Sequence, residues 1–255
     1  MDGVGPEAFG RTIEAALRRE RLALAAGLAL IAAAAWLYLS RMAASMDGDM
    51  AAGFAMTLVM WTVMMAAMML PSASPAILLY AAMARKNAGR GGALAAAWIF
   101  VAGYLLAWAG FSAAAALLQG ALGHAGLLTP MMSSASPWLS GALLLAAGAY
   151  QLTPLKNLCL GKCREPVSFF MTHWHPGPAG ALRMGATHGA YCVGCCWMLM
   201  LLLFALGVMN LAWVALVAAF VVVEKLLPAG RFSSRLAGMA LILAGLTVLV
   251  SSHLS

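Results

Sequence analysis

The sequence comprises 255 residues, of which 64% are apolar and only 9% are charged. A soluble domain of this size carries roughly 25% charged residues, so this chain has too little polar surface to cover a water-soluble globule. The composition therefore excludes most soluble enzyme classes and indicates an integral membrane protein. The net charge of +7 is typical of Lys and Arg gathered in cytoplasmic loops, and we expect no nucleic-acid partner. Five cysteines in so long a chain do not suit a small secreted disulfide scaffold.

Apolar segments long enough to approach or cross a hydrocarbon core of about 30 Å recur along the whole chain. They predict an all-α fold, a polytopic transmembrane helix bundle of about seven spans. In chain order the predicted spans are 22–39, 53–70 with a continuation to about 83, 93–122, 138–153, 185–208, 211–227 and 236–252. We interpret the first as a retained helix rather than a signal peptide, because no small-residue cleavage signature follows it.

Basic residues alternate along the chain in a way that predicts its orientation. With the N-terminus in the cytoplasm, fourteen of the fifteen Lys and Arg residues fall on the cytoplasmic side, and only Arg41 falls outside. This asymmetry predicts a multi-pass protein of a bacterial inner membrane, in contact with the lipid bilayer. Residues 1–21 are then a cytoplasmic N-terminal segment, and residues 22–252 are a single transmembrane helical domain.

The segment 154–184 is too polar and too rich in Pro and Gly to span a membrane. We predict a long loop on the cytoplasmic side, with one short helix and an interfacial stretch around Phe169, Phe170 and Trp174. Because the other loops are short, this long loop is a candidate for function.

A ladder of soft ligands begins the fifth predicted span. His188, Cys192 and Cys196 recur every four residues, and Cys195 lies three residues after Cys192, so a helix would present them on one stripe. Thiolate and imidazole ligands suit copper(I) or zinc and suit hard cations poorly. Each cysteine alone could equally be a small apolar packing residue. The predicted metal ligands in these two regions are Cys159, Cys163, Cys192, Cys195, Cys196 and His188.

Methionine is the second feature, with 19 residues in the chain. In the second span, Met56, Met60, Met64 and Met68 follow one another at four-residue spacing. Thioethers bind copper(I) reversibly, so Met64 and Met68 are candidate ligands on a path that passes a soft ion along. The alternative is that these methionines fill irregular gaps between apolar helices.

Two further features interrupt the apolar helices. Pro71 and Pro75 remove backbone donors, so we expect them to kink or end the second span, with Ser72 and Ser74 bonding the freed carbonyls. Glu224 closes the sixth span. For Glu224 we expect an interfacial structural role, in which its side chain reaches the headgroups.

The runs WTVMMAAMMLPSASP, YQLTPLKNLCLGKCREP, GAYCVGCCWMLM and VVVEKLLPAG occur in that order. Together they resemble the bacterial family of unknown function described as predicted metal-binding integral membrane proteins. The resemblance covers about residues 50–230, and the cysteine-rich runs are its specific part. It implies a metal-binding membrane protein with candidate ligands at the five cysteines, and it implies no particular substrate or activity.

Three functions are compatible with these residues. The leading hypothesis is binding of a soft metal, with copper(I) favoured over zinc, for transport or for delivery at the inner membrane; a metallochaperone is then a candidate partner. The second is a thiol–disulfide redox protein with a redox partner, since Cys-x-x-Cys can cycle between dithiol and disulfide. The third is an assembly or scaffold subunit without metal. No hydrolase or phosphate-binding motif is present, so the sequence gives no support for an enzyme.

Overall fold

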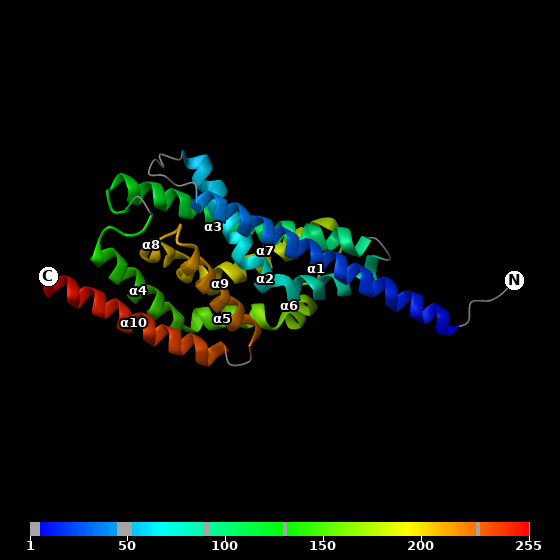
Figure 1. Ribbon diagram of the computed structural model, residues 1–255. Coiled ribbons are helices and arrows are strands. Elements are labelled where there is room, and N and C mark those ends of the chain that lie inside the picture. The colour runs from blue at the N-terminus through cyan, green and yellow to red at the C-terminus, as the bar shows by residue number, and fades with distance from the viewer. Residues whose placement is uncertain (1–5, 45–52, 89–91, 130–131, 228–229, 255) are drawn as a thin grey trace.

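The computed structural model describes residues 6–44, 53–88, 92–129, 132–227 and 230–254, and the secondary structure of these residues is almost entirely helical (Figure 1). The all-α prediction is confirmed. The helices are α1 (Pro6–Ala44), α2 (Phe54–Ala88), α3 (Gly92–His124), α4 (Pro137–Leu152), α5 (Pro154–Arg164), α6 (Pro166–Thr172), α7 (Gly177–Leu201), α8 (Leu203–Leu206), α9 (Leu211–Leu226) and α10 (Gly230–Leu254).

Among the described residues, five helical stretches are long and apolar enough to cross a membrane. They are Arg18–Ala44, Phe54–Arg85, Gly92–His124, Gly177–Leu206 and Phe232–His253. The predicted spans 138–153 and 211–227 correspond to α4 and α9, which have 16 residues each. At 1.5 Å per residue such a helix is about 24 Å long, short of a full hydrocarbon core.

The long helices run roughly along one axis (Figure 1). α3 packs against α7, α4 packs against α10, and α2 packs against both α1 and α3. The start of α1 and the end of α10 lie at opposite ends of this axis (Figure 1). α5 lies against α7, so the region after α4 is part of the bundle.

The segment 154–184 differs from the predicted loop. It contains α5, α6 and the first turns of α7, which begins at Gly177 rather than near residue 185. Prolines explain the breaks between the short helices, because Pro154 holds Thr153 in an extended conformation (φ −71°, ψ 147°) and so ends α4. Pro154 and Pro166 then start α5 and α6 at positions that need no backbone donor.

α2 continues through Pro71 and Pro75 as one helix. Pro75 leaves the Pro71 carbonyl without its usual donor, and the Ser74 hydroxyl donates to that carbonyl at 2.9 Å. Ser72 donates to the Met69 carbonyl, also at 2.9 Å. The Ser74 bond agrees with the prediction that a serine bonds a freed carbonyl, and it helps explain why the helix does not end there, whereas Ser72 bonds a carbonyl that neither proline frees.

Glycines allow α3 and α7 to approach closely. A Cβ atom at Gly185 would lie 2.0 Å from the Phe100 carbonyl oxygen, and one at Gly103 would lie 2.1 Å from the Leu182 carbonyl oxygen. Only a residue without a side chain fits at such a distance, as in other tightly packed membrane helices. This contact holds the cysteine-bearing part of α7 beside Tyr104 of α3.

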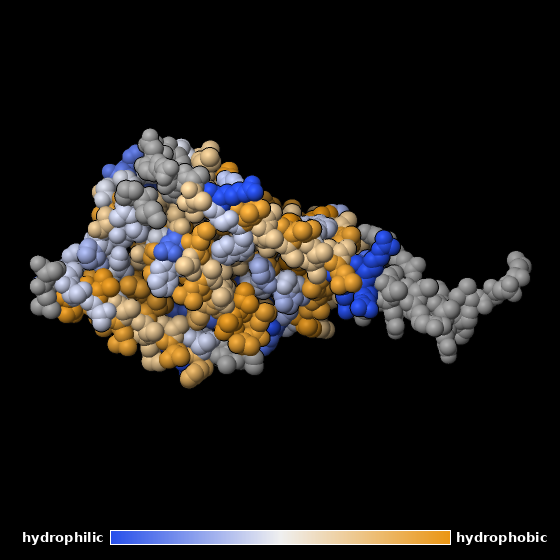
Figure 2. Space-filling view, viewed as in Figure 1, coloured by the Kyte–Doolittle hydropathy of each residue, from blue (hydrophilic) through white to orange (hydrophobic). Residues whose placement is uncertain are grey.

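Apolar side chains cover much of the visible face of the bundle (Figure 2). On α10 the exposed large side chains recur every three or four residues and form one stripe. They are Phe232, Leu236, Met239, Leu243, Leu246 and Val250, each at least 47% exposed. A stripe of this length facing water would be unfavourable, so it suits a helix that faces lipid.

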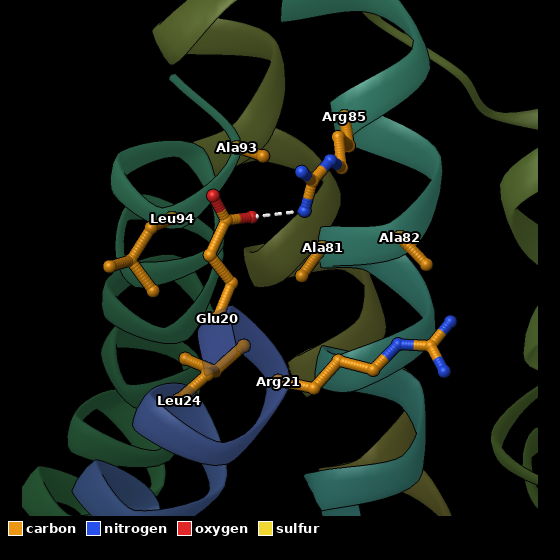
Figure 3. A pocket seen from close by; sticks show the side chains of 8 residues that line it. All are labelled: Glu20, Arg21, Leu24, Ala81, Ala82, Arg85, Ala93 and Leu94. Carbon is orange, nitrogen blue, oxygen red and sulfur yellow. Dashed lines mark hydrogen bonds and ion pairs between the residues drawn. The ribbon is translucent and has the colours of Figure 1, made fainter. Parts of the chain in front are cut away.

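The basic end of α1 is tied to α2. Arg85 donates to Glu20 at 2.6 Å across a small pocket lined by Arg21, Leu24 and Leu94 (Figure 3). Both charged groups are partly exposed. This ion pair therefore sits at the edge of the bundle, where water can reach it.

Candidate metal site

The four predicted ligands on α7 are buried. His188, Cys192, Cys195 and Cys196 are each at most 3% exposed. The four-residue spacing places them on the inner face of α7, as predicted. All five cysteines of the protein are free thiols.

α5 brings its two half-buried cysteines to α7. Cys159 lies over Gly194, and its Sγ atom is 2.9 Å from the position that a Cβ at residue 194 would occupy. Burial raises the pKa of the Cys159 thiol. Hydrogen bonds to Cys192 and Cys195 hold the pKa of the Cys163 thiol well above its usual range. The segment that we expect to be a loop thus brings Cys159 and Cys163 to the helix that carries the other three cysteines.

Cys192 is the centre of this group. Its Sγ atom accepts a hydrogen bond from Lys225 Nζ at 2.9 Å and lies 3.0 Å from the Tyr104 hydroxyl. Cys163 is a third hydrogen-bonding neighbour. Polar groups from α3, α5 and α9 thus converge on one sulfur of α7, and such an environment favours a negatively charged thiolate.

The other two α7 thiols are held by the helix itself. Cys195 and Cys196 donate to the Cys192 carbonyl at 3.1 and 2.8 Å. Cys196 Sγ also lies 4.0 Å from Met69 Sδ of α2. A soft thioether therefore borders the thiol group directly.

His188 lies one turn before Cys192 in an aromatic environment formed by Phe100, Tyr104, Phe169 and Phe170. Its Nδ1 atom is buried and has no hydrogen-bond partner in the described part of the chain. A buried polar atom without a partner is costly. The Nδ1 atom of His188 is therefore available to bind a metal ion or another ligand.

Within the described residues, no group of three or more His, Cys, Asp or Glu side chains is already arranged to hold a metal ion. Two thiols explain part of this, because Cys195 and Cys196 point their protons at a carbonyl of their own helix. Tetrahedral zinc needs four converging donors. A soft monovalent ion can be held by fewer sulfur ligands, so the arrangement gives zinc no support.

Met64 and Met68 are buried in the core, as is Met60, whereas Met56 is 52% exposed. The thioether in contact with a cysteine is instead Met69. His173 and His175 bond backbone carbonyls of their own segment. The structure thus brings four cysteines together at Cys192, places Cys159 beside them, and leaves Met64 and Met68 in the neighbouring core.

The sequence interpretation missed three neighbours of the thiol group, namely Lys225, Tyr104 and Met69. The signal for Lys225 was available, because an ionisable residue within an apolar helix is usually functional. We had counted both Lys225 and Lys156 as cytoplasmic surface charges, but both are buried. Tyr104 and Met69 carry no local signal that separates them from other core residues.

The expectation that the Glu224 side chain reaches the headgroups is wrong, because this side chain is buried and only 1% exposed. Lys156 Nζ donates to its two carboxylate oxygens at 2.6 and 2.8 Å. Ser234 donates to the same carboxylate at 2.6 Å, and Gln151 accepts from Lys156. A buried, fully bonded ion pair therefore joins α4, α5, α9 and α10 beside the thiol group.

The chain was compared with known proteins. A family model described as PpoB2, copper chaperone, matches residues 58–248. No curated protein and no solved structure matches the chain. The matched region contains all five cysteines, Lys225 and Glu224.

Proposed function

The chain belongs to the family described as copper chaperone PpoB2, and on that premise we propose that it binds copper(I) at the thiol group around Cys192. This membership agrees with the resemblance to a metal-binding bacterial family. In the proposal, Cys163 and Cys192 bind the ion first. Cys195 and Cys196 replace them as ligands when the ion is passed on. His188 and Cys159 border the site and complete the predicted set.

The observation that carries the proposal is the packing of α5 against α7, which places Cys159 over Gly194 and makes Cys163 a hydrogen-bonding neighbour of Cys192 and Cys195. Two different helices, α5 and α7, contribute thiols to one group. Packing alone would not require sulfur on both sides of the contact. Soft thiolates select copper(I), and a chaperone needs a site that can release its ion, which an incompletely coordinated group of sulfurs permits.

We place the protein in the bacterial inner membrane, with its N-terminus in the cytoplasm and about seven spans, α4 and α9 included. The basic asymmetry of the sequence supports this orientation, and the opposite positions of the two ends of the bundle support an odd number of spans. The partners would be the lipid bilayer, the metal ion and a protein that receives or supplies it. Labelling of a cysteine introduced at Ala88 by a reagent confined to the periplasm would contradict the orientation.

The copper proposal is tested by the metal content of the reduced protein. We expect protein purified without oxygen, and dialysed against copper(I), to retain about one copper per chain by elemental analysis. A variant with all five cysteines replaced by serine is the control and should retain none. A wild-type protein with no copper above that control, but with a reversible disulfide between Cys192 and Cys195, would favour the redox function instead.

The methionines of α2 are proposed as a path for the ion. Met60, Met64 and Met68 are buried, and Met69 contacts Cys196. Their burial satisfies the condition that a relay must face the bundle interior. The thioethers would pass copper(I) towards the thiols without trapping it.

Changing Met64 and Met68 together to leucine tests this path. The change conserves volume, and such core substitutions usually cost less than about 1.5 kcal/mol, so the protein should fold. We expect slower copper uptake by proteoliposomes, with the equilibrium copper content of the thiol site unchanged. Substitution of the exposed Met56 by leucine is the control. Normal uptake by the double variant would leave the thiol group as the only copper-binding element.

A further inference from the structure

Lys225 is a buried cation that contacts the thiol group. It is 7% exposed, and its ammonium group contacts Cys192 Sγ at 2.9 Å and Ser72 Oγ at 3.0 Å. Ser72 in turn donates to the Met69 carbonyl. The hydroxyl therefore accepts from Lys225, and this bond holds the ammonium group between α2 and α7.

The neighbouring carboxylate does not neutralise this cation. Glu224 precedes Lys225 on α9, and it pairs with Lys156. Across the described ranges, no ion pair between Lys225 and a carboxylate is recorded. The nearest group that can carry a negative charge is the Cys192 thiol itself, with Cys195 and Cys196 as further neighbours.

A copper ion at this place creates a charge that needs a partner. Copper(I) bound by two thiolates carries one net negative charge. In a medium of low dielectric constant an uncompensated charge is strongly unfavourable, and a cation in contact with one of the sulfurs removes most of that cost. A cation placed by a hydroxyl on one side and a sulfur on the other is suited to this task.

We propose that Lys225 is the charge-compensating residue of the copper site, and that it stabilises a copper(I) complex with two thiolates by contacting Cys192. The inference rests on the proposed function and adds to it a residue that binds no metal. Lys225 is a positioning residue, since it acts through a sulfur. Ser72 and the Met69 carbonyl fix its ammonium group at the place where the charge develops.

The test is competition for copper(I) between the purified protein and a chelator of known affinity. We expect Lys225→Met and Lys225→Gln to bind copper about 10- to 100-fold more weakly than the wild type, a loss typical of residues that support a metal ligand. Lys225→Arg keeps the charge and should stay close to the wild type. The Gln side chain keeps a hydrogen-bond donor for Ser72 but carries no charge. If Lys225→Met disturbs the fold, Lys225→Gln therefore still shows the effect of losing the charge on copper affinity.

Two controls separate this role from a structural one. Lys162→Met removes a cation beside Cys163 that has no recorded contact with a sulfur, and it should leave the affinity unchanged. In a Cys192→Ser background, whose weak residual copper binding is measured with a weaker chelator, Lys225→Met should cause no further loss, because its contact is already gone. Wild-type affinity in Lys225→Met, or an equal loss in both backgrounds, would overturn the inference. Absence of copper from the wild-type protein would instead overturn the proposed function.

Discussion

Replacing Cys192 by serine should nearly abolish tight copper(I) binding. Cys192 is the sulfur on which Cys163, Tyr104 and Lys225 converge, so it is the one ligand that the rest of the site is built to hold. A hydroxyl is a hard, neutral donor that copper(I) binds poorly. The loss should exceed the roughly 100-fold that is the upper range for supporting residues. The measurement is the same chelator competition.

The matched control is Cys159→Ser. Cys159 comes from the same helix as Cys163 and is half-buried, yet its sulfur lies against Gly194 and outside the hydrogen bonds around Cys192. We expect less than about a tenfold loss for this variant, because it leaves the converging thiols in place. If Cys159→Ser and Cys192→Ser weakened binding equally, the proposal that the site is centred on Cys192 would be wrong.

The ladder on α7 could be predicted because a helix repeats every 3.6 residues and the sequence fixes that period locally. The approach of Cys163 was also predictable, since only one long segment could bring further thiols to α7. The other neighbours depend on tertiary packing. Lys225 and Tyr104 lie at sequence separations of 33 and 88 residues from Cys192, and no local pattern specifies such contacts.

The packing of the predicted spans also could not be read from local sequence patterns. Hydropathy predicted a helix for each of the seven spans and gave α4 and α9 nearly their observed lengths, but it did not show which helices they pack against. Prolines in the segment 154–184 suggested a loop, whereas in the structure they begin short helices. A proline marks a boundary in the chain, and the structure that follows it is decided by what that segment can pack against.

Removing the charge of Glu224 should destabilise the bundle more than any surface change. In Glu224→Gln the Lys156 ammonium, which is fully buried, loses its counter-ion. Breaking a buried ion pair in this way costs about 3–5 kcal/mol, because one charge stays buried and uncompensated. We expect a fall of that size in the free energy of unfolding, measured by chemical denaturation in detergent micelles. Replacing both residues together by Met should recover much of the loss.

The control for this prediction is the partly exposed pair of Glu20 and Arg85, whose side chains are 31% and 15% exposed. Water screens these charges, so Glu20→Gln should cost less than about 1 kcal/mol. The two substitutions make the same chemical change, and only burial distinguishes them. Similar losses at the two sites would mean that the Lys156–Glu224 pair is reached by water. A bundle that loosens in Glu224→Gln should also bind copper less tightly, since Glu224 and Lys225 share one turn of α9.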